Sequence, residues 1–328
     1  MQEAASVSII IPVPNINDYI LESAPEILKL DWPDYEIIIF PDEEDKSHSW
    51  PKTRIIASGK VGPAEKRDLA LKYAKGDILA FLDDDAYPEK SWLTKAIIHF
   101  SDRDVAAVGG PAITPQNDSF MQKVSGSVWE SYVGGWIARN RNLSLGEARD
   151  VDDWPTVNFL IRKEVFKEIG GFDSAYWPGE DTKLCLDILE TGRRIVYEPK
   201  AIVYHHRRAS LVKHFRQIGN YGLHRGFFTK RYPANSRKIG YLAVIFYDCY
   251  LLLLFLIIIF GRSHPLFALA LGLPLTIYVL ATIFDGIIIS IRRKNFFMGL
   301  LTAPLIISTH FWYGVRYAQG LIIKNLER

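Results

Sequence analysis

Two long apolar segments near the C-terminus constrain this chain of 328 residues more than any other feature. Residues 241–260 and 266–291 each carry one charged side chain, Asp248 and Asp285 respectively. Because about 20 apolar residues cross the roughly 30 Å hydrocarbon core of a bilayer, both segments are predicted to be transmembrane helices. The alternative is a buried helical hairpin in a soluble protein. The run LLLLFLIII disfavours it, because a surface helix carries a polar face.

A third apolar segment, residues 296–318, is interrupted by His310 and Arg316. Its second half is aromatic and amphipathic, which suits a helix in the membrane interface as well as a spanning helix. The sequence therefore predicts a membrane region over residues 239–328 with two or three transmembrane helices.

Basic clusters flank the apolar segments. They comprise Arg225, Lys230, Arg231, Arg237 and Lys238 before the first segment, and Arg292, Arg293 and Lys294 between the second and third. By the positive-inside rule both clusters are expected in the cytoplasm, with the turn at 261–265 on the far side. Residues 1–6 lack the basic region that begins a signal peptide. We therefore expect a multi-pass plasma-membrane protein with a cytoplasmic N-terminal domain.

Charge divides the remaining sequence in two. Residues 1–192 hold 20 basic and 33 acidic side chains, whereas residues 193–238 hold 12 basic side chains and a single acid, Glu198. We predict one domain over 1–192 and a basic juxtamembrane segment over 193–238. Basic segments beside a membrane are typical of contacts with anionic lipids, so we expect membrane lipids as partners and no nucleic acid.

The N-terminal domain alternates apolar strands with amphipathic helices. Strands are expected at 7–12, 36–40, 54–57, 78–82 and 105–109, and helices at 17–30, 62–74 and 89–100. This alternation predicts an α/β fold with a mostly parallel sheet and right-handed crossovers. Ligands of such sheets bind beyond the carboxyl ends of the strands.

Three acidic residues, Asp83, Asp84 and Asp85, follow the strand at 78–82 directly. Carboxylates this close repel one another unless a cation lies among them. Oxygen ligands favour Mg²⁺ or Mn²⁺, often together with substrate phosphates. A solvated acidic turn before a helix would explain the same residues.

Two further clusters carry candidate chemistry. Glu180 and Asp181 precede a predicted helix, where either capping or catalysis would explain them. His205 and Arg208 follow a short strand that begins near Ile202. The histidine could complete a metal site and the arginine could hold a phosphate.

The chain resembles glycosyltransferase family 2, whose members have the GT-A fold of nucleotide-sugar enzymes. The resemblance extends from Val7 to about Gly226. It rests on five motifs in order: VSIIIPVPN, GPAEKRDLALKYAKGDILAFLDDDAYP, AVGGP, FLIRKEVFKEIGGFDSAYWPGEDTKLCLDILETGRRIVYEP and AIVYHHRRASLVKHFRQIGNYG. It implies that residues 1–192 are the GT-A catalytic core and that the basic segment completes the active site.

The resemblance also implies roles for single residues. Asp83 and Asp85 match the DxD pair that holds Mg²⁺ or Mn²⁺ against the diphosphate, and His205 matches a histidine near that metal. Asp181 matches the general base, with Glu180 beside it near the acceptor. The residues expected around the nucleotide-diphosphate sugar are Pro12, Val13, Asp42, Lys66, Arg67, Asp84, Arg208, Gln217 and Tyr221.

Two departures from the family pattern matter. Pro41 stands where the family usually has the first of two acids, and Asn220 replaces the arginine of the QxxRW motif of related synthases. The second departure counts against a processive polysaccharide synthase, as does the small number of spans.

We therefore expect a membrane-anchored inverting glycosyltransferase that adds one sugar to a lipid-linked, polyprenyl-type acceptor in polysaccharide or glycoprotein biosynthesis. A processive synthase and a catalytically inactive membrane scaffold are the alternatives. Trp129, Trp136 and Trp154 are candidates for stacking on a sugar, with a place in the core as the alternative for at least one of them.

Overall fold

The computed structural model describes residues 5–172, 176, 178–260 and 265–326. The chain forms two compact units. Unit 1 contains residues 1–115 and 140–206, and unit 2 contains residues 116–139 and 207–327. The predicted division at 192 and 238 follows charge, whereas these units follow packing.

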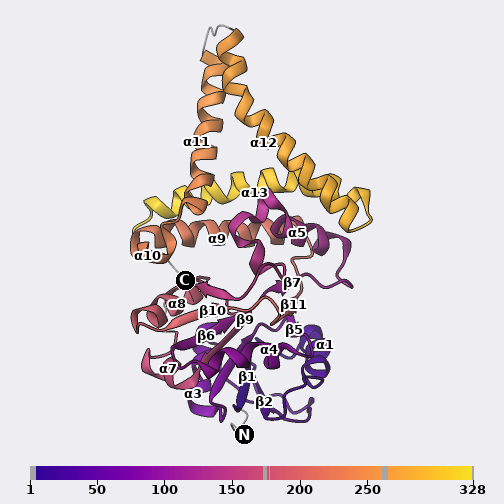
Figure 1. Cartoon of the computed structure of the whole chain (residues 1–328), viewed down its shortest axis with the longest axis vertical. Helices are drawn as coiled ribbons and strands as arrows, with labels where there is room; N and C mark the ends of the chain where they lie inside the picture. Colours follow the sequence, from indigo (N-terminus) through magenta and orange to yellow (C-terminus); the bar gives the residue numbers. More distant parts are fainter. Residues whose placement is uncertain (1–4, 173–175, 177, 261–264, 327–328) are drawn as a thin grey trace. The chain divides into compact units, whose positions relative to one another are not determined.

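Unit 1 is built on an eight-stranded sheet (Figure 1). In sheet order its strands are β3 (Thr53–Ile55), β2 (Tyr35–Phe40), β1 (Val7–Pro12), β4 (Ile78–Leu82), β9 (Asn158–Arg162), β6 (Val105–Gly109), β10 (Arg194–Tyr197) and β8 (Arg149–Val151). A second sheet has the order β5 (Ala86–Pro88), β11 (Val203–His205) and β7 (Ala112–Ile113).

The large sheet is mixed rather than wholly parallel. β3, β2, β1 and β4 run parallel, as predicted, and β10 is parallel to β6. β9 lies between β4 and β6 and is antiparallel to both, and β8 is antiparallel to β10. The prediction of a mostly parallel sheet with flanking helices is confirmed, although β8, β9 and β10 were not among the strands expected.

Apolar side chains on alternate positions of β1 explain why this strand is central. Ile9 and Ile11 belong to the apolar cluster on one face, and Ile10 belongs to the cluster on the other. A strand buried on both faces reads as a continuous apolar run, which is what VSIIIP shows. The helices of unit 1 are α1 (Asp18–Ile27), α2 (Pro63–Asp68), α3 (Ala70–Tyr73), α4 (Trp92–Ile97), α7 (Lys163–Glu168), α8 (Glu180–Glu190) and the 3₁₀ turn η1 (Ile98–Ser101).

Unit 2 is helical. It consists of α5 (Phe120–Glu130), α6 (Tyr132–Gly135), most of the 3₁₀ turn η2 (Trp136–Arg141), α9 (Leu211–Arg231), α10 (Pro233–Ser236), α11 (Ile239–Phe260), α12 (Pro265–Arg292) and α13 (Phe296–Ile322). Within the described residues, Ile239–Ile259, Leu271–Arg292 and Phe296–Ile322 are long and apolar enough to cross a bilayer. The turn predicted at 261–265 lies almost wholly outside the described residues.

The third apolar segment packs along α9 (Figure 1). Glycines permit the close approach, because a Cβ at Gly226 would lie 2.1 Å from the Tyr317 carbonyl oxygen and one at Gly320 would lie 2.1 Å from that of Leu223. Small residues allow helix backbones to approach in this way. The opposite face of α13 exposes apolar side chains, among them Phe296 and Phe297.

Candidate active site

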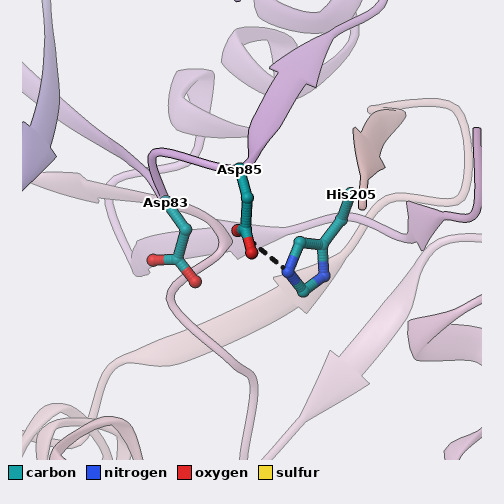
Figure 2. A group of neighbouring side chains, drawn as sticks. All are labelled: Asp83, Asp85 and His205. Atoms are coloured by element: carbon teal, nitrogen blue, oxygen red, sulfur yellow. Dashed lines mark ion pairs between the residues drawn. The ribbon is translucent and has the colours of Figure 1, made fainter. Parts of the chain in front are cut away.

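The carboxyl end of β4 carries the candidate metal ligands. Asp83 and Asp85 follow β4, and the pairing of β5 with β11 sets His205 opposite Ala86. Figure 2 shows the imidazole of His205 facing the carboxylate of Asp85, with Asp83 alongside. The ligand atoms of these three residues lie within 4.8 Å of one another, and His205 Nε2 is 3.1 Å from Asp85 Oδ1.

This donor set fits a divalent cation. Two carboxylates supply hard oxygen ligands, and an imidazole nitrogen is acceptable to Mn²⁺ and its neighbours in the first transition row. Asp85 and His205 are largely buried, whereas the side chain of Asp83 is 33% exposed, so one side of the cluster remains open to a ligand from solution. The cluster brings together the three residues, Asp83, Asp85 and His205, that the sequence indicated as candidate metal ligands.

Asp84, between the two candidate ligands, has a different set of contacts. The side chain of Asp84 accepts a 2.6 Å hydrogen bond from Asn17 Nδ2, and Asn17 also caps the first turn of α1. Burial raises the pKa of Asp84 to about 6, with a further contribution from the charge of Asp85. Asp84 therefore ties the acidic loop to α1, and its predicted contact with the nucleotide stays a prediction.

Arg67 connects the acidic loop to the start of α8. Its guanidinium donates to Asp83 Oδ1 at 2.6 Å and to Glu180 Oε1 at 3.2 Å, and its side chain is 4% exposed. Burial raises the pKa of Glu180, and the charge of Arg67 opposes that rise. The resemblance placed Arg67 near the diphosphate. In the structure its two outer nitrogens are already bound to carboxylates, so it holds the two acidic motifs together.

Asp181 lies one residue further along α8 and is half-buried. The helix starts after Gly179, whose φ of 118° is accessible to glycine and to few other residues. Asp181 Oδ1 accepts a hydrogen bond from the backbone N–H of Thr182 at 2.8 Å. A carboxylate is favourable at a helix N-terminus, so capping accounts for the position of Asp181, and its role as the general base stays a prediction. Part of the preceding loop, residues 173–175 and 177, lies outside the described residues.

Lys66 organises the pocket expected for the nucleotide base. Its ammonium donates to the carbonyl oxygen of Val13 at 2.6 Å and to that of Phe40 at 3.3 Å, and it pairs with Asp42. An ammonium has three protons, and these three acceptors use them all. Lys66 therefore holds the ends of β1 and β2 together, and Asp42 keeps a side chain that is 23% exposed.

Sequence reasoning missed two asparagines that support the site. Asn17 holds Asp84, as described above. Asn158 is fully buried, accepts from Trp92 Nε1 and donates to the carbonyl oxygens of Pro111 and Ala201, so it joins β9 to the chain around the small sheet. The helix-capping position of Asn17 was a usable signal. No local pattern marks Asn158.

The remaining predicted residues divide between the units. Trp154 is 1% exposed and donates to the carbonyl oxygen of Gly110, so the core alternative is correct for it. Arg208, Gln217 and Tyr221 belong to unit 2, where Gln217 Nε2 donates to the hydroxyl of Tyr221 at 3.0 Å. Their predicted roles stay predictions.

The mixed sheet and the acidic cluster at its carboxyl edge together define the class of GT-A glycosyltransferases. Residues 8–170 match the family model described as glycosyl transferase family 2. This part of the chain belongs to that family, which confirms the resemblance seen in the sequence.

Known proteins agree with this class. The chain is 32% identical over 185 residues to a pre-mycofactocin glycosyltransferase of Mycobacterium tuberculosis, covering 54% of this chain and 37% of the relative. It is 27% identical over 154 residues to a glucosyl-dolichyl phosphate glucuronosyltransferase of Haloferax volcanii, covering 44% of this chain and 47% of the relative. The chain thus spans less than half the length of these curated relatives.

Solved structures share the fold. A mannosyltransferase from Pyrobaculum calidifontis, solved in complex with GDP-Man and Mn²⁺, aligns with a TM-score of 0.54 at 15% identity. The alignment covers 99% of this chain and 89% of that one. At this identity the likeness concerns the fold alone.

Proposed function

We propose that this protein is an inverting glycosyltransferase that moves a sugar from a nucleotide-diphosphate sugar to a lipid-linked acceptor at the cytoplasmic face of the plasma membrane. The observation that carries the proposal is the cluster of Asp83, Asp85 and His205, joined through Arg67 to the start of α8. This arrangement supplies a cation site and a carboxylate base from separate elements.

Asp83, Asp85 and His205 would hold Mg²⁺ or Mn²⁺. Such a cation, when bound, stabilises negative charge on a departing diphosphate. The mannosyltransferase from Pyrobaculum calidifontis, which shares the fold, supports this choice because it was solved with GDP-Man and Mn²⁺. Lys66 and Asp42 would shape the wall that receives the nucleotide base.

Asp181 would accept the proton of the acceptor hydroxyl. The hydroxyl oxygen forms a bond to the anomeric carbon while the bond from that carbon to the diphosphate breaks, and the proton passes to the Asp181 carboxylate. Attack from the side opposite the leaving group inverts the anomeric centre. General-base catalysis contributes roughly 10²–10⁴-fold to such a step.

Three observations support a lipid acceptor. The apolar helices α11 and α12 are suited to a bilayer, and basic clusters flank them as the positive-inside rule requires of cytoplasmic loops. The name of the Haloferax volcanii relative includes a dolichyl phosphate.

A single addition is favoured over processive synthesis because Asn220 interrupts the QxxRW motif.

Donor screening with the purified full chain in detergent tests the proposal. Nucleotide sugars are supplied with Mn²⁺ or Mg²⁺ and a polyprenyl-phosphate-linked saccharide, and nucleoside diphosphate release and product mass are measured. We expect release with one donor and a product heavier by one sugar. A ladder of products would indicate a processive synthase, and saturable donor binding without release would indicate a scaffold.

The base is tested by Asp181→Asn, with Glu190→Gln as the matched control. Glu190 is exposed at the other end of the same helix. We expect Asp181→Asn to bind the donor normally and to transfer at least about 100-fold more slowly, while the control keeps full activity. Loss of donor binding in Asp181→Asn would assign this residue to the donor site instead.

A further inference from the structure

A basic pocket lies in unit 2 and includes the basic cluster between the second and third apolar segments. It is an open cavity of about 400 Å³, lined by Gln116, Phe120, Lys123, Arg292, Arg293, Lys294, Asn295 and Met298. Half of these residues are cations, and none of the described residues that line it is acidic. A concave surface with this charge is suited to an anion.

The turn between α12 and α13 builds one wall of the pocket. α12 ends at Arg292, and Lys294 adopts a left-handed conformation with φ of 49°, so the chain turns within a few residues into α13. Asn295 then caps α13 by accepting from the N–H of Met298. The N-terminus of this long helix adds partial positive charge to the same wall.

Among the residues that the structure describes, one of the four cations, Arg293, is neutralised by a neighbour. Arg293 forms two hydrogen bonds of 2.6 and 2.7 Å with the buried carboxylate of Glu130 on α5, which fixes the turn against that helix. Lys123, Arg292 and Lys294 form no ion pair with any residue that the structure describes. Three uncompensated charges therefore converge on one cavity.

An apolar rim borders these cations. Ile291, just before the turn, is 72% exposed. Phe296 and Phe297, just after it, are 68% and 66% exposed. Large apolar side chains at such exposure are unfavourable in water and favourable in the acyl region of a bilayer. Cations directly beside them would then lie at the depth of the lipid phosphates.

We propose that this pocket binds the phosphate group of an anionic membrane lipid, with the lipid chains against Ile291, Phe296 and Phe297. The cations recognise the phosphate, and the apolar rim selects a lipid over a soluble phosphate. A lipid held there would fix the depth of the turn between α12 and α13 in the membrane.

Native mass spectrometry of the full chain in detergent tests this. Phosphatidylglycerol is titrated against the wild type and against the triple variant Lys123→Gln, Arg292→Gln, Lys294→Gln. Each basic side chain near an anionic lipid contributes roughly a fivefold preference, so we expect the triple variant to lose roughly 100-fold in affinity. Arg293 is left intact because it holds Glu130.

The matched control removes three exposed cations of unit 1 through Lys60→Gln, Lys75→Gln and Lys95→Gln. It should keep the affinity of the wild type. The charge-preserving variant Arg292→Lys should also keep it, and the single variant Arg292→Gln, which disturbs the fold least, should lose roughly fivefold.

Two results would overturn the assignment. An equal loss in the control and the pocket variant would show attraction to overall charge rather than a site. The second result concerns inorganic phosphate. If it displaced phosphatidylglycerol at the same concentration as glycerol-3-phosphate does, and bound as tightly as the lipid, the pocket would be a site for soluble phosphate. Weak competition by both head-group mimics would support the lipid.

Discussion

Replacing Arg67 by methionine tests whether one buried guanidinium holds the two acidic motifs together. Methionine keeps the apolar stem but leaves Asp83 and Glu180 without their cation, and the Glu180 side chain is only 7% exposed. Removing one partner of a buried ion pair costs about 3–5 kcal/mol. Because Asp83 is 33% exposed and can be hydrated, we expect the lower part of that range.

The loss should depend on pH. Burial already raises the pKa of Glu180, and removing Arg67 removes the charge that opposes this rise. The folded variant then binds a proton that the unfolded chain has released, so its stability falls as pH rises above the ordinary glutamate value of about 4.3. Arg67→Met should therefore be more destabilising at pH 8 than at pH 5.

Pulse proteolysis in urea, with mass spectrometry of peptides from residues 7–115, measures the unfolding of unit 1 in the full chain. Arg54→Met is the control, because its pair with Glu36 is partly exposed and should be worth less than about 1 kcal/mol. Equal urea midpoints for Arg67→Met and the wild type at pH 8 would refute the reasoning. So would an Arg54→Met loss as large as that of Arg67→Met.

Two further predictions follow from the cation cluster and from the packing of α9. Asp85→Asn should weaken Mn²⁺ binding at least tenfold, measured from the electron paramagnetic resonance signal of free Mn²⁺; an unchanged affinity would remove Asp85 from the ligand set. Gly226→Ala should destabilise unit 2 by about 1–3 kcal/mol, because its Cβ would meet the Tyr317 carbonyl oxygen at 2.1 Å. Gly272→Ala is its control, since nothing lies within 4 Å of that Cβ, and thermal melting with equal losses in both variants would contradict the packing argument.

Continuous apolar runs made much of unit 1 predictable. The boundaries of β1, β4 and β6 agree with the runs at 7–12, 78–82 and 105–109, because strands buried on both faces have no polar positions to blur their ends. The antiparallel strand β9 escaped notice. Its sequence, NFLIR, continues into the helical KEVFKE, and nothing local shows that it enters between β4 and β6.

The candidate ligands were predictable for a different reason. Asp83 and Asp85 follow a recognisable strand, and His205 ends another, so motif and strand end together indicate a common edge. The roles of Lys66 and Arg67 were not predictable, because their partners come from distant parts of the chain. Arg67 meets Glu180 across 113 positions, and only the folded sheet brings α2 and α8 together.

Asp285 shows how one charge can be compatible with a membrane helix. Its side chain is 2% exposed, and its two oxygens accept hydrogen bonds from the backbone N–H groups of Tyr132 and Val133, at 3.0 and 2.7 Å. On the same face of α12, Ile289 is also buried, whereas Phe284 on another face is 62% exposed. The carboxylate therefore faces protein and caps α6. An ionisable residue in a membrane segment is expected to face protein in this way, so Asp285 supports the membrane assignment of α12 and ties this helix to the segment that carries α5 and one wall of the basic pocket.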